Sequence, residues 1–169
     1  IAALKYVLTN LIKEHNLQSM ALQCWDELQS QLGICPCFVH AIITDEGTPV
    51  SCESDVHGAI SSLMLQAASM FEEPAFFSDL TIRHPENDNA ELLWHCGPFP
   101  PSLRKDKNEG FIDDHFILPS HAPGTCNWQL KKGNITLIRF DGIGGNYSLL
   151  CGEGKAVDGP FTLGTYVYL

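Results

Sequence analysis

Apolar residues recur at helical spacing in two stretches of the chain. An amphipathic helix is predicted for residues 1–16, because apolar side chains stand three or four positions apart there: Ile1, Leu4, Leu8, Leu11 and Ile12. The strongest helical pattern covers residues 56–70, and one face of that helix is expected to carry Ile60, Leu63, Met64 and Ala67.

Short apolar runs bounded by turn residues predict strands on either side of the second helix. Residues 20–25 predict a short buried strand and residues 26–37 a short helix and turn. The run before the turn at 45–47 fits either a strand or a helix, and residues 74–83 predict another strand. A strand, a helix and a second strand in this order are typical of a parallel βαβ crossover, in which ligands lie beyond the carboxyl ends of the strands.

The pattern changes after residue 98. Pro and Gly become frequent, and four short β-prone runs follow at 115–119, 134–140, 146–154 and 162–169. This predicts an antiparallel, barrel-like C-terminal module. The fold class is therefore mixed α/β, with an α/β portion at residues 1–98 and a β-rich module at 99–169.

Composition narrows the classes of partner. The formal charge of −10 repels phosphate backbones and anionic membrane surfaces, so we expect neither nucleic acid nor membrane as a partner. No apolar run approaches the ~20 residues that span a bilayer, and seven cysteines at irregular spacing fit reduced thiols. A cytoplasmic protein is expected, and because the chain begins without Met inside a helix, we expect it to be part of a longer one.

Two carboxylates are the strongest candidates for chemistry. Glu53 follows one predicted strand, and Asp79 stands near the end of the next, 26 residues later. If both reach the same rim of the sheet, they can hold a divalent cation through oxygen ligands. The alternative is that Glu53 caps a helix and Asp79 ends a strand in solvent.

Other polar and aromatic residues are weaker candidates. His95 follows a β-prone run and could complete a metal site with mixed oxygen and nitrogen ligands, or contact the substrate. Trp25 could stack on a sugar, although aromatic residues are more often part of a core. Cys35 and Cys37 are two positions apart, lack a second pair at zinc-binding spacing, and are expected to be buried thiols.

Several segments in the same order resemble one family. LQCWDEL, GICPCFV, GTPVSCESDVHGAISSLMLQAAS, FFSDLT and LLWHCG resemble the C-terminal half of the L-fucose isomerase-like sugar isomerases, which are related in fold to the L-arabinose isomerases. GNITLIRFDGIGGNYSLLCGEG resembles that family's C-terminal β-domain. The resemblance implies an Mn²⁺-type enzyme that interconverts an aldose and a ketose, with a small sugar as its substrate.

The resemblance also implies roles for individual residues. Glu53 and Asp79 match the family's metal-binding carboxylates, which exchange the proton between C1 and C2, while Asp55 is expected near the substrate or at the helix cap. The family's metal site takes a further histidine, for which His95, His121 or a residue beyond Leu169 is expected. The family also has N-terminal domains and is homo-oligomeric, so this chain is expected to be an incomplete site by itself.

Two alternatives remain open at this point. One is a non-catalytic carbohydrate-binding or regulatory module of the same fold. The other is a different metal-assisted carbonyl reaction on the same carboxylates, such as an aldol cleavage.

Overall fold

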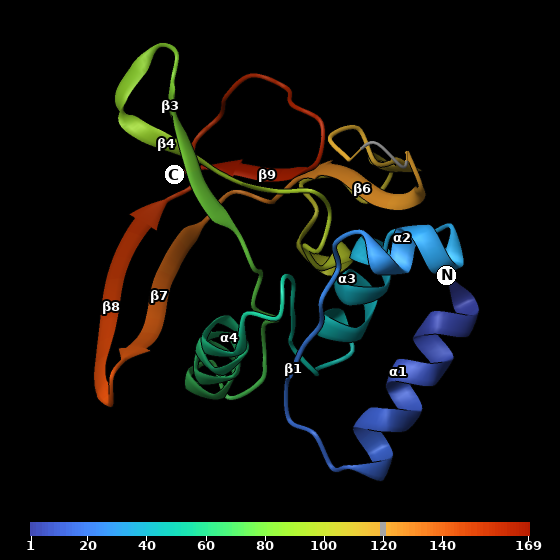
Figure 1. Ribbon diagram of the computed structural model, residues 1–169. Helices are drawn as coiled ribbons and strands as arrows, with labels where there is room; N and C mark the ends of the chain where they lie inside the picture. The colour runs from blue at the N-terminus through green and yellow to red at the C-terminus, as the bar shows by residue number, and fades with distance from the viewer. Residues whose placement is uncertain (119–120) are drawn as a thin grey trace.

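The computed structural model describes residues 1–118 and 121–169 and combines helices with three sheets (Figure 1). Its elements, in chain order, are α1 (Ala2–Glu14), β1 (Met20–Ala21), α2 (Glu27–Leu32), α3 (Cys37–Asp45), β2 (Val50–Ser51), α4 (Val56–Ala68), β3 (Asp79–His84), β4 (Asn87–His95), a 3₁₀ turn (Pro101–Leu103), β5 (Phe111–Asp114), β6 (Pro123–Gln129), β7 (Asn134–Ile143), β8 (Asn146–Lys155) and β9 (Thr165–Tyr168).

A parallel βαβ unit is present, but it precedes α4 in the chain, whereas the sequence predicted it around that helix. β1 and β2 pair in parallel, and α2 and α3 connect them. The ambiguous run before the turn at 45–47 is helical and forms α3. The predicted pairing of β3 with the parallel unit is wrong: β3 forms an antiparallel hairpin with β4. Only two residues separate these strands, and such a short connection permits an antiparallel neighbour but no parallel crossover.

The largest sheet has five strands in the order β3-β4-β9-β6-β5. It draws strands from both sides of residue 98, while the division into two domains there stays a prediction. The mixed α/β class is confirmed, but the described strands form no closed barrel: the end strands of the large sheet, β3 and β5, do not pair, and β7 and β8 pair only with each other. Residues 115–118 of one β-prone run are not a strand, and residue 119 lies outside the described residues.

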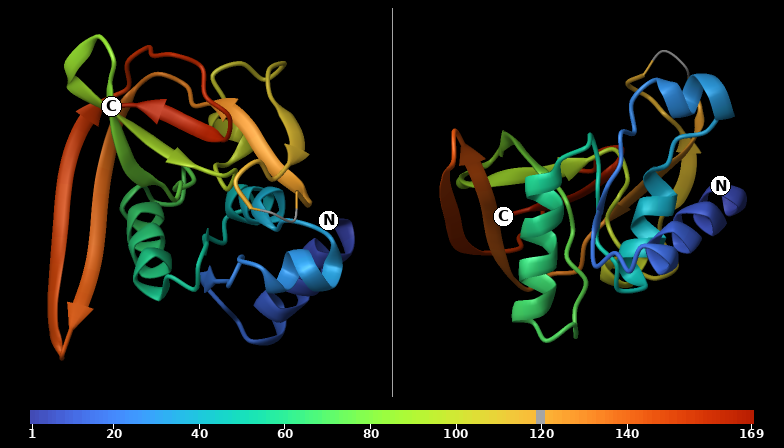
Figure 2. Two further views of the ribbon diagram at one scale, coloured as in Figure 1. Left: turned by 45° about the horizontal axis from the view of Figure 1, so that its top comes forward. Right: turned by 60° about the horizontal axis from the view of Figure 1, so that its bottom comes forward.

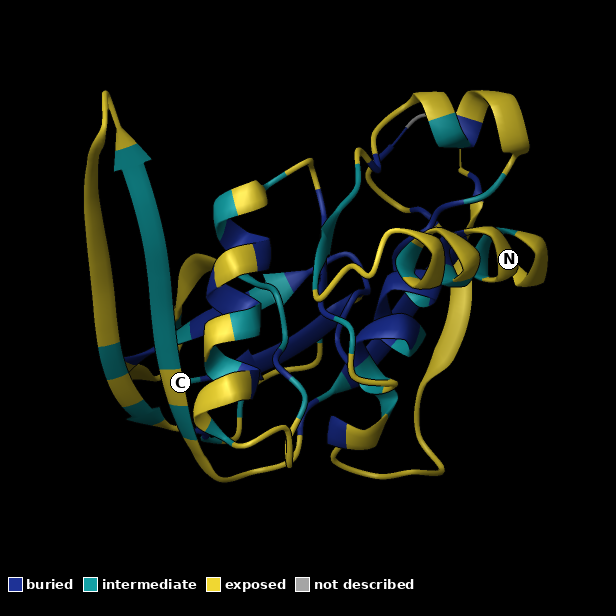
Figure 3. Ribbon diagram, turned by 90° about the horizontal axis from the view of Figure 1, so that it is seen from below, coloured by how far each residue is buried: buried dark blue, intermediate teal, exposed yellow. Residues whose placement is uncertain are grey.

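The β7–β8 ribbon extends beside α4 and away from the large sheet (Figure 2). α4 docks on β7 through a small residue: the backbone N–H of Phe140 donates to Ser61 Oγ over 2.9 Å. The buried residues of α4 are Gly58, Ala59, Ser61, Ser62 and Gln66. Its inner face is therefore not the apolar face predicted from the sequence. The outer strand of the hairpin, β8, is exposed along most of its length (Figure 3).

Two apolar clusters hold the helices to the sheets. The larger lies between α3 and the five-stranded sheet around the fully buried Phe99, and includes Leu93, Trp128 and Val167. The smaller packs α1 onto α3 and β2 through Leu8. Within the described residues, no helix is both long and apolar enough to cross a bilayer.

Candidate functional site

The segments that follow β1 and β2 run side by side at the end of the parallel pair. The N–H of Leu22 donates to the Ser51 carbonyl over 3.0 Å, and the N–H of Ser54 donates to the Leu22 carbonyl over 3.3 Å. Ser54 Oγ also donates to Gln23 Oε1 over 3.2 Å. The carboxyl ends of the parallel strands thus place Glu53 next to residues 22–25, at the position where ligands collect in such sheets.

Glu53 has an unusual backbone conformation. Its φ is 61° and that of Ser54 is 57°, so two consecutive non-glycine residues lie in the left-handed region. Each such residue costs roughly 1–3 kcal/mol and persists only where the surroundings impose it, most often at functional sites. This conformation favours a functional role for Glu53 over simple helix capping.

Helix capping is carried out by Asp55 instead. Its Oδ1 accepts a 2.9 Å hydrogen bond from the N–H of Gly58, and its Oδ2 pairs with the guanidinium of Arg139 on β7. Burial alone would raise the pKa of Asp55, but the hydrogen bonds from Arg139 and Gly58 and the charge of Arg139 lower it overall. Next to this pair, His57 Nδ1 lies 3.0 Å from Asp141 Oδ1. These polar contacts tie α4 to the hairpin.

The Glu53 side chain is held by the segment after β1. Trp25 Nε1–H donates to Glu53 Oε1 over 3.0 Å. Next to it, the contact with Cys52 and, to a lesser degree, the backbone N–H of Glu53 lower the pKa of Cys24, against the effect of burial. The remaining carboxylate oxygen, Oε2, accepts no hydrogen bond from any residue in the described part of the chain and is available to a ligand.

His95 ends β4 and is almost fully buried, with 2% of its surface exposed. Its Nδ1 accepts a 3.0 Å hydrogen bond from the N–H of Cys96, whereas its Nε2 has no partner among the described residues. The neutral ring therefore carries its proton on Nε2, which makes this atom a hydrogen-bond donor. Burial lowers the pKa of His95, but the contact with Cys96 and the negative charges of Asp79 and Glu53 outweigh it and raise the pKa overall.

The sequence predicted Asp79 near the end of a strand. It is instead the first residue of β3. The antiparallel hairpin reverses the expected strand polarity and places Asp79 opposite Trp94, next to the position of His95. Asp79 is exposed. The charges of Asp79 and Glu53 both act on the His95 imidazole, where they contribute to its raised pKa.

These residues are of the types that bind divalent cations. Carboxylate oxygens are the ligands that Mn²⁺ and Mg²⁺ prefer, and such ions keep several positions for water and substrate. Over residues 1–118 and 121–169, no three His, Cys, Asp or Glu side chains converge as ligands of one ion. Glu53 and Asp79 fit a two-carboxylate site, while His95 would have to bind through its other tautomer to act as a third ligand.

A layer of buried thiols and imidazoles lies beneath Glu53. His40 Nδ1 is 3.3 Å from the sulfur of Cys52. The contact of Cys52 with Cys24, together with burial, raises the pKa of Cys52. Near His95, the sulfurs of Cys37 and Cys96 lie 3.5 Å apart. Both Cys35 and Cys37 are buried free thiols, as predicted.

The two sulfurs near His95 differ in acidity. The contact with Cys37, followed by those with His115 and with His95, whose Nδ1 is 3.3 Å from the sulfur, lowers the pKa of Cys96 against the effect of burial. The same contact with Cys96, together with burial, raises the pKa of Cys37. This layer was not predicted from the sequence, although seven cysteines interspersed with histidines in apolar segments were a signal for it.

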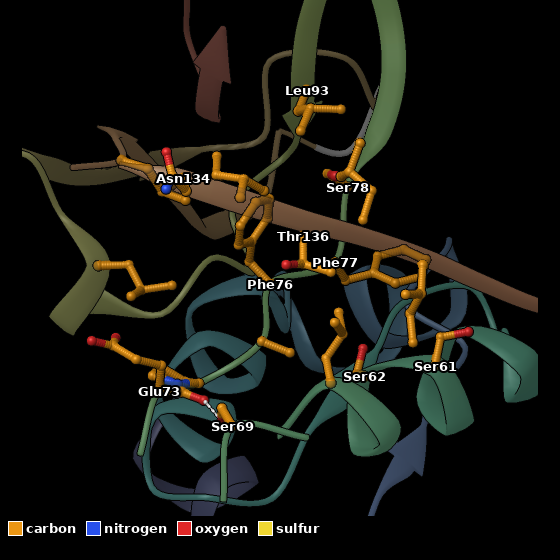
Figure 4. A pocket seen from close by; sticks show the side chains of 18 of the residues that line it. Ser61, Ser62, Ser69, Glu73, Phe76, Phe77, Ser78, Leu93, Asn134 and Thr136 are labelled. Carbon is orange, nitrogen blue, oxygen red and sulfur yellow. Dashed lines mark hydrogen bonds between the residues drawn. The ribbon is translucent and has the colours of Figure 1, made fainter. Parts of the chain in front are cut away.

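A large pocket lies elsewhere, between α4, β7 and residues 73–80 (Figure 4). It has a volume of about 680 Å³ and is lined mainly by apolar side chains, among them Phe76, Phe77 and Leu93. Neither Glu53 nor Asp79 is among the described residues that line it. Phe77 connects the two regions, because its ring also lies 5.2 Å from that of His95.

Comparison with known proteins finds relatives with one name. The chain is 34% identical over 150 residues to a sulfoquinovose isomerase of Alkalicoccus urumqiensis, covering 88% of this chain and 33% of that protein. It is 33% identical over 154 residues to a sulfoquinovose isomerase of Priestia aryabhattai (89% and 33%). A third, from Clostridium sp. (strain MSTE9), is 31% identical over 152 residues (88% and 33%).

The extent of the match matters for its interpretation. The chain spans about a third of the length of the curated relatives it matches, and no family model matches it. The similarity supports the coarser part of the resemblance, to sugar isomerases. None of these relatives is named an L-fucose or L-arabinose isomerase.

Proposed function

We propose that the protein is an aldose–ketose isomerase and that this chain contributes Glu53, Asp79 and His95 to its active site. The observation that carries the proposal is Glu53 at the end of a parallel strand, with a left-handed backbone and a carboxylate held by Trp25. Its charge acts on the buried imidazole of His95, whose Nε2 has no partner among the described residues, and the chain is similar to sulfoquinovose isomerases. The L-fucose isomerase-like character inferred from the sequence motifs is part of the same proposal.

We further propose that Glu53 and Asp79 hold a divalent cation, with Mn²⁺ as the first candidate. When bound, the cation supplies positive charge that polarises the sugar carbonyl and stabilises negative charge developing on the substrate. Glu53 Oε2 is the oxygen left available for this purpose, since Oε1 is occupied by Trp25.

The chain's own residues would move protons. For conversion of an aldose to a ketose, a proton leaves C2 and returns to C1, while O2 loses its hydroxyl proton and O1 gains one. Glu53 and Asp79 are proposed as the base and acid of the carbon proton transfer. His95 Nε2–H is proposed to donate a hydrogen bond to a sugar oxygen, a role that suits its present tautomer better than metal ligation.

Sulfoquinovose, a glucose with a sulfonate in place of its 6-hydroxyl, is the first sugar to test. The chain has a net charge of −10, so its overall field does not attract an anionic sugar, and recognition of the sulfonate must rest on local donors. Trp25, joined to Glu53, and Asp55, two residues after it, are retained as candidate substrate contacts. Homo-oligomerisation and a cytoplasmic location remain predictions.

The test is the isosteric variant Glu53→Gln, with Glu86→Gln at an exposed position as its control. Incubation with sulfoquinovose and Mn²⁺ in D₂O, followed by NMR, reports both ketose formation and solvent deuterium at the transferred position. General acid–base catalysis contributes about 10²–10⁴-fold, so Glu53→Gln should lose at least a hundredfold while the control keeps its rate. Equal rates in both variants would refute the proposal, and a parent protein that binds the sugar without turning it over would favour the non-catalytic module.

A further inference from the structure

Trp25 and Glu53 belong to two different loops that are joined by one side-chain hydrogen bond. Trp25 lies after β1 and Glu53 after β2, and the indole N–H donates to Oε1 over 3.0 Å. We infer that Trp25 is a positioning residue, which holds the Glu53 carboxylate in the orientation that exposes Oε2 to the ligand. The inference rests on the proposed function, because it concerns the working orientation of that carboxylate.

The surroundings of Trp25 do not indicate a core residue. Its side chain is 46% exposed, unlike that of Trp128, which is 6% exposed within the main apolar cluster. The residue that follows it, Asp26, has a φ of 52°, so both loops contain left-handed non-glycine residues. Backbone in this region is retained only where contacts impose it. The hydrogen bond between the two loops is one such contact.

The physical effect expected is a restriction of the carboxylate. The terminal torsion of a glutamate is broad, so an untethered carboxylate samples many orientations. A donor on one oxygen selects one orientation. The hydrogen bonds from Ser54 to Leu22 and Gln23 hold the backbone next to Glu53 in place. A stacking role on the sugar, expected from the sequence, would use the indole face instead of its N–H.

The hydrogen bond can be tested without metal or substrate. In the ¹⁵N-indole NMR spectrum, Trp25→Phe identifies the Trp25 cross-peak by its loss. Glu53→Gln should then shift that peak to lower proton frequency, because a charged acceptor is replaced by a neutral one, while the buried Trp128 peak serves as the internal reference. An unmoved Trp25 peak overturns the inference and leaves the proposed function untouched.

The positioning role is tested by Mn²⁺ affinity and by kinetics. Trp25→Phe keeps an aromatic ring but removes the donor, whereas Trp25→His keeps a ring N–H. Hydrogen bonds to charged groups correspond to about a tenfold to hundredfold effect, so Trp25→Phe should weaken Mn²⁺ binding, measured by the EPR signal of the free ion, by about tenfold. It should lower kcat with little change in KM, and Trp25→His should recover part of both losses.

Two results would contradict this role. If Trp25→Phe raised KM and left kcat and Mn²⁺ affinity unchanged, Trp25 would act on the sugar by stacking. If Trp25→His were as impaired as Trp25→Phe, the N–H would not be the operative group. A protein that showed the NMR coupling and the affinity change but no isomerisation would keep the positioning role and refute the proposed reaction.

Discussion

His40 provides a quantitative test of the buried thiol and imidazole layer. The side chain is fully buried on α3, its Nδ1 contacts the sulfur of Cys52, and its Nε2 has no partner among the described residues. Burial lowers its pKa from 6.5 to about 4, against the opposing charge of Cys96. The imidazole is therefore neutral in the folded protein at neutral pH.

The sign of the pH dependence follows from this shift. The unfolded chain takes up a proton at His40 below about pH 6.5, whereas the folded protein does so only below about pH 4. Acidification between these values favours unfolding. At about 1.36 kcal/mol for each unit of pKa difference, the loss between pH 7 and pH 4 amounts to about 3 kcal/mol.

The experiment compares the parent protein with His40→Gln, which cannot titrate. Urea unfolding, followed by circular dichroism at several pH values, gives the free energy of unfolding of each. Relative to the parent, the free energy of unfolding of His40→Gln should rise by about 3 kcal/mol as the pH falls from 7 to 4. His15→Gln, at an exposed position at the end of α1, measures the effect of removing a surface imidazole. A difference that stays constant with pH would refute the reasoning, because it would mean that His40 is hydrated or paired in solution.

Two further predictions concern the frame of the site. Asp55→Ala removes the N-cap of α4 and the partner of Arg139, so it should cost ~1–2 kcal/mol of unfolding free energy at pH 7. Asp55→Asn should keep the cap but lose the charge. Because the pKa of Asp55 is lowered in the folded state, the stabilisation from its charge is present at neutral pH and is lost as the pH falls below about 4. Urea titrations should therefore show the free energies of unfolding of the parent and Asp55→Asn converging between pH 7 and pH 3. Gly97→Ala introduces a Cβ against the backbone N of Cys126 at a φ of +140°, which should cost roughly 2–4 kcal/mol. Gly152→Ala, where a Cβ meets nothing within 4 Å, is its control in thermal unfolding, and equal stability of the two would contradict the packing described around Gly97.

Parts of the candidate site could be predicted because they depend on local sequence. The polar residues that follow a short strand and precede α4 directed attention to Glu53, and the sequence motifs added Asp79 and His95. The contacts around them could not be predicted in the same way. Neither the Trp25–Glu53 hydrogen bond nor the Cys37–Cys96 contact has a periodic signature, because each joins segments 28 and 59 residues apart.

The sequence by itself determined that α1, α2 and α4 are helical and that the β-prone runs are concentrated in the second half of the chain, but it left α3 undecided between helix and strand. Helical periodicity and turn residues act within a few positions, so α1 and α4 were predictable to within a few residues. Only the tertiary structure decided the partner of β3, the inner face of α4 and the burial of His95 with an Nε2 that no described residue contacts through a hydrogen bond. These features depend on strand pairing and packing between distant segments, and the free energies that select them come from contacts that no single stretch of sequence contains.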